Sequence, residues 1–290
     1  MTTPQHNREL PMPEFLARSP VPWALRLVPP LPSVANRILA LVSNDDVGAP
    51  EVGELVKTDP SFSAELLRFA NSPLFGARRE VTSLSHAIAL VGMDRVKTMA
   101  TLVALNRMVR TSIRIEALNK VWVHSLVTAF IAEEAARAFR QPRETGYTVG
   151  LLHDLGMLGL MSAYPDQYSC MLEVNRSFGF HSLETERDLF EIDHCLAGCY
   201  LAQDWDFPDE LAAAIAVHHD EPDGGERSLD NLIKVAWRLS DCLGFAGFPP
   251  ERTWDYEELL SFVPISGSEW LDSPEDARAE LDRRLAALAA

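Results

Sequence analysis

The sequence has little positive charge, and it contains no long apolar run. Lysine and arginine total 26 against 42 aspartate and glutamate residues, which gives a net charge of −16 over 290 residues. An acidic surface repels phosphate backbones, so we expect no nucleic-acid polymer among the partners and no docking to membranes. No apolar stretch reaches the ~18–20 residues that span a bilayer, and the first ten residues are polar. We therefore expect a cytoplasmic protein.

Cysteines are also scarce, and their number argues against a disulfide framework. The four are Cys170, Cys195, Cys199 and Cys242, and all lie in segments with helical patterns. A chain of this length that depended on disulfides would carry more, so we expect reduced thiols. Cys195 and Cys199 stand four residues apart and could bind a metal or react. We favour the simpler interpretation that each is a small buried apolar residue.

Proline is concentrated at the beginning of the chain, with eight of the 19 prolines in the first 32 residues. Because proline lacks an amide proton and blocks helix interiors, residues 1–25 are predicted to form an extended arm. Apolar residues then recur at helical spacing, and runs that alternate with period two are scarce. The sequence therefore predicts an all-α fold: an N-terminal helical bundle over about 33–110, a second multi-helix bundle from about 114, and a C-terminal helical extension over 223–290 that carries Asp241.

Individual helices can be placed from the same patterns. Asp59-Pro60 is typical of a helix start, since aspartate caps a helix and proline suits its first turn. The longer helices are predicted near 115–139, 144–162, 193–204, 208–219, 228–245 and 274–289. The last of these is rich in charged residues, and we expect it to cap the bundle or to face a partner.

Five of the eight histidines lie in or at the end of predicted helices. They are His124, His153, His194, His218 and His219, and two carboxylates accompany them, Asp154 and Asp241. The helix faces that carry these residues are apolar, so the polar groups are expected to point into the protein. A buried carboxylate is costly unless it is paired or binds a metal.

These seven side chains have the chemistry of a metal centre. Neutral imidazoles and carboxylates suit a divalent first-row metal such as iron, manganese or zinc. The set would suffice for one ion or two, and two ions together can activate water and hold a phosphoryl group. Glycines stand nearby, at Gly150, Gly156, Gly198 and Gly244, and would let the helices approach closely. The alternative for any single histidine is a hydrogen-bonded core residue without a metal.

The order of these residues, a histidine, then His-Asp, then two neighbouring histidines and a helical aspartate, resembles the HD phosphohydrolase superfamily. The surrounding segments resemble the HDOD domain, the HD-related output domain of bacterial signalling proteins, over residues 26–222. These segments are PPLPSVANRILALVSND, VKTDPSFSAELLRFANSPLFG, VTSLSHAIALVGMDRVKTMA, VWVHSLVTAF, GLLHDLGMLGL and LAGCYLAQDWDFPDELAAAIAVHH. The resemblance implies an HD-like helical bundle and a regulatory, mostly non-catalytic role.

The same positions also resemble the HD-GYP subgroup, which hydrolyses cyclic di-GMP at a site of two or three metals. Carried over position by position, this resemblance implies a ligand set of His124, His153, Asp154, His194, His218, His219 and Asp241. Two departures weaken a catalytic role. Met157 stands where the subgroup has a lysine that holds a substrate phosphate, and Gly225-Glu226-Arg227 replaces the Gly-Tyr-Pro stretch. Arg238 or Lys234 could supply the missing positive charge.

Two function classes remain open. The first, favoured by the HDOD resemblance, is a signalling scaffold that binds a partner protein, with dimerisation of the chain as one route and any metal structural. The second is a metal-dependent phosphohydrolase that acts on a nucleotide or a cyclic dinucleotide, with Asp154 bridging two metals as its catalytic residue. A pocket that binds a nucleotide without turnover is a further alternative. Met157 favours the scaffold, whereas the complete ligand set favours the enzyme.

Overall fold

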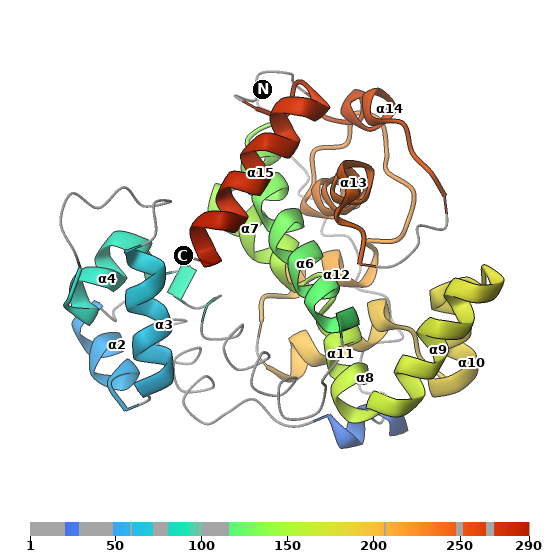
Figure 1. Cartoon of the computed structure of the whole chain (residues 1–290), viewed down its shortest axis with the longest axis horizontal. Coiled ribbons are helices and arrows are strands. Elements are labelled where there is room, and N and C mark those ends of the chain that lie inside the picture. Colours follow the sequence, from blue (N-terminus) through green and yellow to red (C-terminus); the bar gives the residue numbers. More distant parts are fainter. Residues whose placement is uncertain are drawn as a thin grey trace, which may run out of the picture.

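The computed structural model describes residues 21–28, 49–58, 60–71, 81–93, 95–96, 99, 116–205, 207–247, 252–264 and 270–289. Every regular element in these ranges is a helix, which confirms the all-α prediction (Figure 1). In chain order the elements are η2 (Trp23–Leu27), α2 (Ala49–Val56), α3 (Pro60–Ala70), α4 (Leu84–Val91), α6 (Glu116–Ala135), α7 (Arg143–Leu152), α8 (Leu155–Ala163), α9 (Pro165–Phe178), α10 (Ser182–Phe190), α11 (His194–Asp204), α12 (Asp209–Ala216), α13 (Leu229–Ser240), η4 (Asp241–Phe245), α14 (Tyr256–Ser261) and α15 (Pro274–Ala289).

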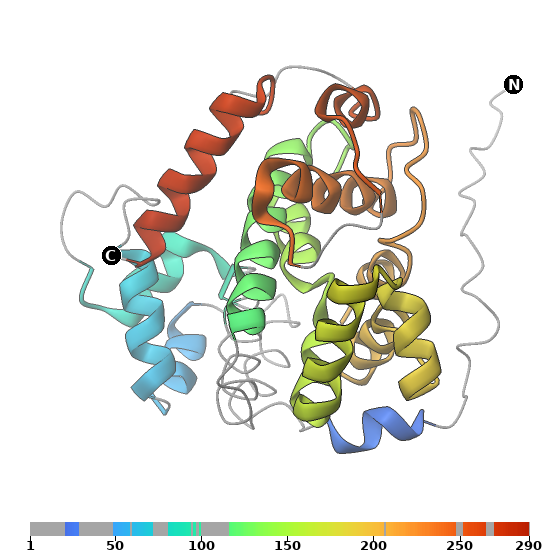
Figure 2. The ribbon, with the colours of Figure 1, turned by 45° about the vertical axis from the view of Figure 1, so that its right-hand side comes forward.

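The described helices gather around two hydrophobic cores. Helices α2, α3 and α4 enclose the smaller one, in which Val52, Leu66 and Ile88 are deeply buried. The helices from α6 onward, together with η2, enclose the larger one. The small group lies beside the main body, on the side toward which the C-terminal end of α15 points (Figures 1 and 2). Of the bundle predicted over 33–110, residues 33–48, 59, 72–80, 94, 97–98 and 100–110 lie outside the described ranges.

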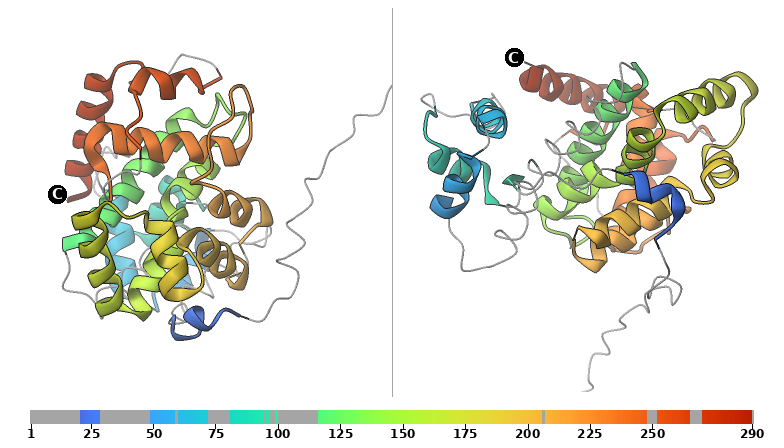
Figure 3. Two further views of the ribbon diagram at one scale, coloured as in Figure 1. Left: turned by 90° about the vertical axis from the view of Figure 1, so that its right-hand side faces the viewer. Right: turned by 90° about the horizontal axis from the view of Figure 1, so that it is seen from below.

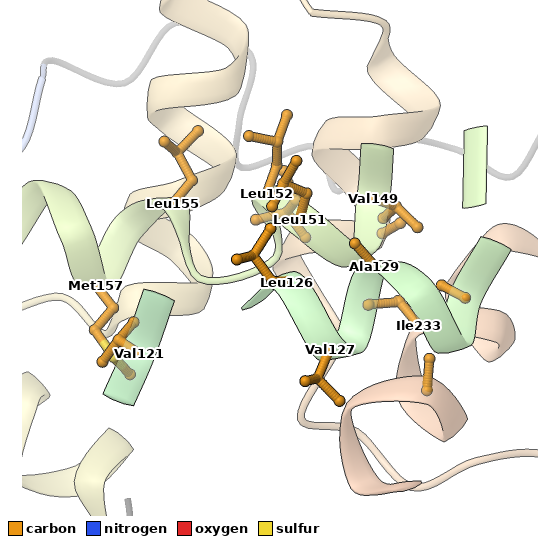
Figure 4. Close-up of a cluster of buried hydrophobic side chains, with 14 of the residues drawn as sticks. Val121, Leu126, Val127, Ala129, Val149, Leu151, Leu152, Leu155, Met157 and Ile233 are labelled. Carbon is orange, nitrogen blue, oxygen red and sulfur yellow. The ribbon is translucent and has the colours of Figure 1, made fainter. Parts of the chain in front are cut away.

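Helix α6 runs through the main body, with α7 and α13 packed against it. A Cβ added to Gly150 of α7 would lie 2.6 Å from the Cα of Ala129 in α6, so this close contact between the helices requires glycine. Apolar side chains such as Val127 and Leu152 fill the space around it (Figure 4). Burying one such side chain fully stabilises the fold by about 1.5–3 kcal/mol. The apolar side chains packed around Gly150 therefore hold α6 and α7 together.

The helix predicted over 144–162 is interrupted at two residues, His153 and Asp154. Helix α7 ends at Leu152 and α8 begins at Leu155, with Asp154 at φ −92° and ψ 19°, outside the helical region. The prediction of one continuous helix was therefore wrong. The break turns the chain and leaves both polar residues at a junction between helices, where their side chains can meet groups from other elements.

Other elements also differ from the prediction. Of the arm predicted over residues 1–25, residues 1–20 lie outside the described ranges. Trp23–Leu27 forms a 3-10 helix, and its Leu25 is buried in the main core. No bounds were predicted for α9 and α10, although Cys170 of α9 was placed in a segment with a helical pattern. Both helices lie at the edge of the main body, away from α2–α4 (Figure 3). Helix α9 begins at Pro165 and ends before Gly179, which has a left-handed conformation at φ 70°.

The C-terminal part wraps back over α6. Helix α13 ends at Ser240 and continues into the short turn η4, where Gly244 adopts φ 81°. Gly244 was expected to allow a close approach between helices. Its left-handed backbone conformation, which glycine adopts most readily, is the stronger reason for a glycine at this position. Helix α15 packs against α6 and η4 and buries Ala277 and Leu281, so it caps the bundle. None of the described helices is both long and apolar enough to cross a membrane.

Candidate metal centre

Five histidines and Asp154 meet where several helix ends approach the middle of α6. His124 comes from that middle, His153 and Asp154 from the break between α7 and α8, His194 from the first position of α11, and His218 and His219 from the turn after α12. Helices α8 and α11 are in close contact here, since a Cβ on Gly156 would lie 2.0 Å from the carbonyl oxygen of His194. The close approach predicted for Gly150, Gly156 and Gly198 is confirmed.

Asp154 lies at the centre of this group. Its Oδ2 is 3.4 Å from Nε2 of His153 and 3.9 Å from Nε2 of His124. Its other oxygen, Oδ1, is 3.6 Å from Nε2 of His218 and 3.8 Å from Nε2 of His194. The two oxygens of one carboxylate thus face two different pairs of imidazoles. All five of these residues are buried.

The outer nitrogens of the rings are held by the surrounding protein. Nδ1 of His153 is 2.7 Å from the carbonyl oxygen of Gly150, and Nδ1 of His218 is 2.7 Å from that of Ile215. Nδ1 of His124 lies 3.1 Å from the carbonyl oxygen of Phe245. A carbonyl oxygen only accepts, so each Nδ1 carries the proton. In the neutral ring, each Nε2 then presents a lone pair toward Asp154, which is the tautomer that binds metals. Burial alone would lower the pKa of His218, but in the metal-free protein Cys195 and Asp154 outweigh it and raise that pKa to about 9.

These lone pairs face one another inside the protein, and a cation between them would make the contact favourable. Nε2 of His153 and Nε2 of His124 are 3.2 Å apart. In the tautomers fixed by the backbone carbonyls, neither nitrogen carries a proton, so the two cannot hydrogen-bond to each other. Nε2 of His218 is buried without a hydrogen-bond partner. Buried acceptors that face one another destabilise a fold unless a proton or a metal ion lies between them. The donor set, imidazoles with one carboxylate, fits a divalent metal ion.

The candidate ligands form two groups in the described residues. One ligand atom from each of His124, His153 and Asp154 lies within 4.8 Å of the others, and the same holds for His194, Cys195, His218 and His219. Asp241 belongs to neither. Its Oδ1 lies 3.4 Å from Nδ1 of His124, on the ring nitrogen opposite the one that faces Asp154. This oxygen of Asp241 is buried and has no hydrogen-bond partner among the described residues.

Protonation in the metal-free protein suits ligand binding at the first group. Burial lowers the pKa of His153 to about 3, so its imidazole is neutral. Burial alone would raise the pKa of Asp154, but the neighbouring imidazoles, led by His153, bring it well below its ordinary value. Burial raises the pKa of Asp241 to about 6. A neutral imidazole beside an ionised carboxylate is the state that a metal requires.

The structure adds residues that the sequence did not single out. Glu186 of α10 is fully buried, and its Oε2 accepts hydrogen bonds from the backbone N–H of His194 at 2.7 Å and from its Nδ1 at 2.8 Å. Tyr168 of α9 donates a hydrogen bond to the same carboxylate. Burial would lower the pKa of His194, but Glu186 outweighs it and raises that pKa. Cys195, interpreted as a small apolar residue, lies among the candidate ligands.

Comparison with known proteins places most of this chain in one family. The sequence model of the HDOD domain matches residues 28–221. The chain belongs to the HDOD domain family. An uncharacterized protein of Treponema pallidum (strain Nichols) is 27% identical over 252 residues, which are 84% of this chain and 47% of that protein. The chain thus spans about half the length of the curated relative that it matches.

Solved structures of similar fold support the architecture. An HDOD domain protein of unknown function from Geobacter sulfurreducens gives a TM-score of 0.67 at 23% identity, covering 90% of this chain and 91% of that one. A provisionally named phosphohydrolase from Shewanella amazonensis gives 0.67 at 23%, covering 92% and 96%. A provisionally named signal transduction protein from Marinobacter aquaeolei gives 0.66 at 24%, covering 90% and 58%. At these identities the similarity shows the fold.

Two residues bear on phosphate binding: Met157 inside the matched HDOD segment and Arg238 beyond its end. Met157 is buried in the main core rather than exposed to a ligand (Figure 4). The guanidinium of Arg238 donates to the carbonyl oxygens of Lys234 at 2.8 Å, His219 at 2.8 Å and His218 at 3.3 Å. Arg238 therefore holds the turn that carries the two histidines through Nη1 and Nη2, while its buried Nε has no hydrogen-bond partner in the part of the chain that the structure describes.

Proposed function

We propose that this chain is a signalling output module of the HDOD family that acts through a partner protein and holds a divalent metal ion in its histidine cluster. The observation that carries the proposal is that Arg238, the buried cation next to His218 and His219, binds the protein backbone. Its Nη1 and Nη2 atoms donate to three backbone carbonyls, and its Nε is buried. A phosphate substrate brings two or more negative charges into the site, and it needs donors that are free to bind it.

Met157 supports the same conclusion. A methionine thioether offers no proton to a phosphate oxygen, and this side chain is packed in the core. The paired lone pairs of His124 and His153 support the metal, because a cation between them removes the conflict of two buried acceptors at 3.2 Å. In such a signalling module, metal would bind to the ligand groups on either side of Asp154. It would hold in place the helix ends on which these ligands lie.

Elemental analysis and a thermal unfolding assay on the same preparation test the proposal. Protein purified without chelator is expected to contain a divalent metal, and removal of the metal is expected to lower the melting temperature, because the ion binds only the native state. His153→Ala should reduce both the metal content and the fall in melting temperature that metal removal causes. Protein that contains no metal and unfolds at the same temperature with and without chelator would contradict the metal centre.

A second candidate function is a metal-dependent phosphohydrolase, and one observation favours it. The two oxygens of Asp154 face different histidine pairs, His153 with His124 and His218 with His194. A carboxylate in that position can bridge two metal ions, and such a pair would supply activation of water and neutralisation of a phosphoryl group. Turnover of a cyclic dinucleotide or a nucleotide by the metal-loaded protein, lost in Asp154→Asn with the fold retained, would replace the first proposal with this one.

A further inference from the structure

Cys195 occupies a different environment from the other buried cysteine of its helix. It is the second residue of α11, directly after His194, and it is buried. Cys199 follows one turn later on the same helix and packs into the main hydrophobic core. Only Cys195 has its sulfur among imidazole nitrogens, with one ligand atom each from His194, His218 and His219 inside a 4.8 Å group. The two thiols therefore have different neighbours despite similar burial.

A second observation points to a ligand at the same place. Nε2 of His218 is fully buried, has no hydrogen-bond partner and belongs to the group that contains Cys195. The Cys195 thiol offers this nitrogen only a weak hydrogen bond, so the buried imidazole is poorly satisfied by the protein alone. A divalent ion would satisfy both, since it binds nitrogen at about 2.0–2.1 Å and thiolate sulfur at about 2.3 Å.

The first turn of α11 is also held rigidly, as a ligand-bearing segment needs to be. The Asp193 side chain caps the helix by accepting from the backbone N–H of Leu196 at 2.8 Å. Glu186 accepts from the backbone N–H of His194. Arg238 fixes the facing turn through the carbonyls of His218 and His219. Residues that lock the backbone on both sides keep the four donors together before any ion binds.

We infer that Cys195 is a thiolate ligand to a divalent metal ion shared with His194, His218 and His219. The inference rests on the proposed metal centre and adds the kind of metal that it takes. One thiolate with three imidazoles is a four-donor set that suits tetrahedral zinc, whereas the neighbouring group of His124, His153 and Asp154 has only nitrogen and oxygen donors. The cluster therefore contains two chemically different subsites.

Cobalt(II) substitution tests the sulfur ligand directly. The full chain is freed of metal with a chelator, checked for retained helicity by circular dichroism, and titrated with Co²⁺ while the absorption spectrum is recorded. We expect visible d–d bands of tetrahedral cobalt together with a near-ultraviolet sulfur-to-cobalt charge-transfer band. Cys195→Ser and Cys195→Ala should lose the charge-transfer band, and zinc affinity measured by chelator competition should fall by more than about tenfold, a loss typical even of residues that only orient a ligand.

Two matched variants control for two of the three other thiols, and the third, that of Cys242, donates to the carbonyl oxygen of Trp254. Cys199→Ala removes the second buried cysteine of α11, and Cys170→Ser removes an exposed one; both should keep the band. Cobalt d–d bands in the wild type without a charge-transfer band would overturn the thiolate and leave the histidine metal centre standing. A wild-type protein that binds no cobalt and no zinc at all would overturn the proposed metal centre together with this inference.

Discussion

Glu186 holds both the backbone and the ring of His194 with a single carboxylate oxygen. The Oε2 atom lies 2.7 Å from the backbone nitrogen of His194 and 2.8 Å from its Nδ1. The carboxylate is fully buried, and Tyr168 donates to its other oxygen. A carboxylate behind a metal-binding histidine fixes the ring and makes its free nitrogen a better donor. Helix α10 therefore serves the candidate metal centre although it contributes no ligand.

Replacing this carboxylate by an amide is expected to weaken metal binding. Glu186→Gln keeps the size of the side chain but removes its charge, and we expect a loss of about 10- to 100-fold in zinc affinity, the range typical of such supporting residues. Competition with a chromogenic chelator measures this loss. Glu184→Gln, an exposed position on the same helix, is the control and should leave the affinity unchanged. Equal affinities for both variants would argue that Glu186 only stabilises the fold.

Gly156 is expected to tolerate no side chain. A Cβ at this position would lie 2.0 Å from the carbonyl oxygen of His194 and 2.3 Å from the backbone nitrogen of Gly198. Both are backbone atoms, so α8 and α11 would have to separate. We expect Gly156→Ala to lower the free energy of unfolding by about 1–3 kcal/mol or more, measured by chemical denaturation. Gly224→Ala, where nothing lies within 4 Å of the added atom, should change it little.

The convergence of the histidines could be predicted from the sequence, because it depends on helical spacing. Apolar neighbours such as Val121 and Val127 place His124 on the inner face of its helix, and the structure buries all three. The break at His153 and Asp154 could not be predicted in the same way. The end of α7 and α8 from Leu155 to Ser162 are buried on every side, so apolar residues continue through the break without a change of phase.

Glu186 was missed for a different reason. Helix α10 carries several charged residues, and the sequence gives no sign that Glu186 is the buried one while Glu184 is exposed. Its role depends on how the turn between α10 and α11 brings it back to His194. The same holds for Cys195, whose pattern fits an apolar helix position and whose neighbours His218 and His219 are more than twenty residues away in the sequence.

The burial of His153 predicts an effect of pH on the stability of the metal-free protein. Burial lowers its pKa to about 3 in the native state from an ordinary value of 6.5. Between these values the unfolded chain binds a proton that the native state does not, so acid favours unfolding. The contribution of His153 to the free energy of unfolding is therefore fully present above about pH 6.5 and falls by about 1.4 kcal/mol per pH unit toward pH 3.

His153→Gln isolates this contribution. The amide can still donate to the carbonyl oxygen of Gly150, but it does not titrate. The free energy of unfolding of chelator-treated protein is measured by denaturation at several pH values between about 3 and 6.5. Its slope against pH should be smaller in the variant than in the wild type, by at most about 1.4 kcal/mol per pH unit. Identical slopes for the two proteins would mean that His153 is not held neutral by its surroundings.

Glu133 joins three parts of the molecule, and breaking one of its ion pairs is expected to be costly. This buried residue of α6 pairs with Arg284 of α15, whose nitrogen lies 3.4 Å away, and with Arg95 from the segment after α4. Arg284→Met should lower the free energy of unfolding by about 1–3 kcal/mol, because it removes a charged donor from a buried carboxylate. Arg283→Met, next to it and exposed with its own partner Glu280, should cost no more than about 0.5–1 kcal/mol. Similar losses in the two variants would show that α15 is held by its apolar face alone.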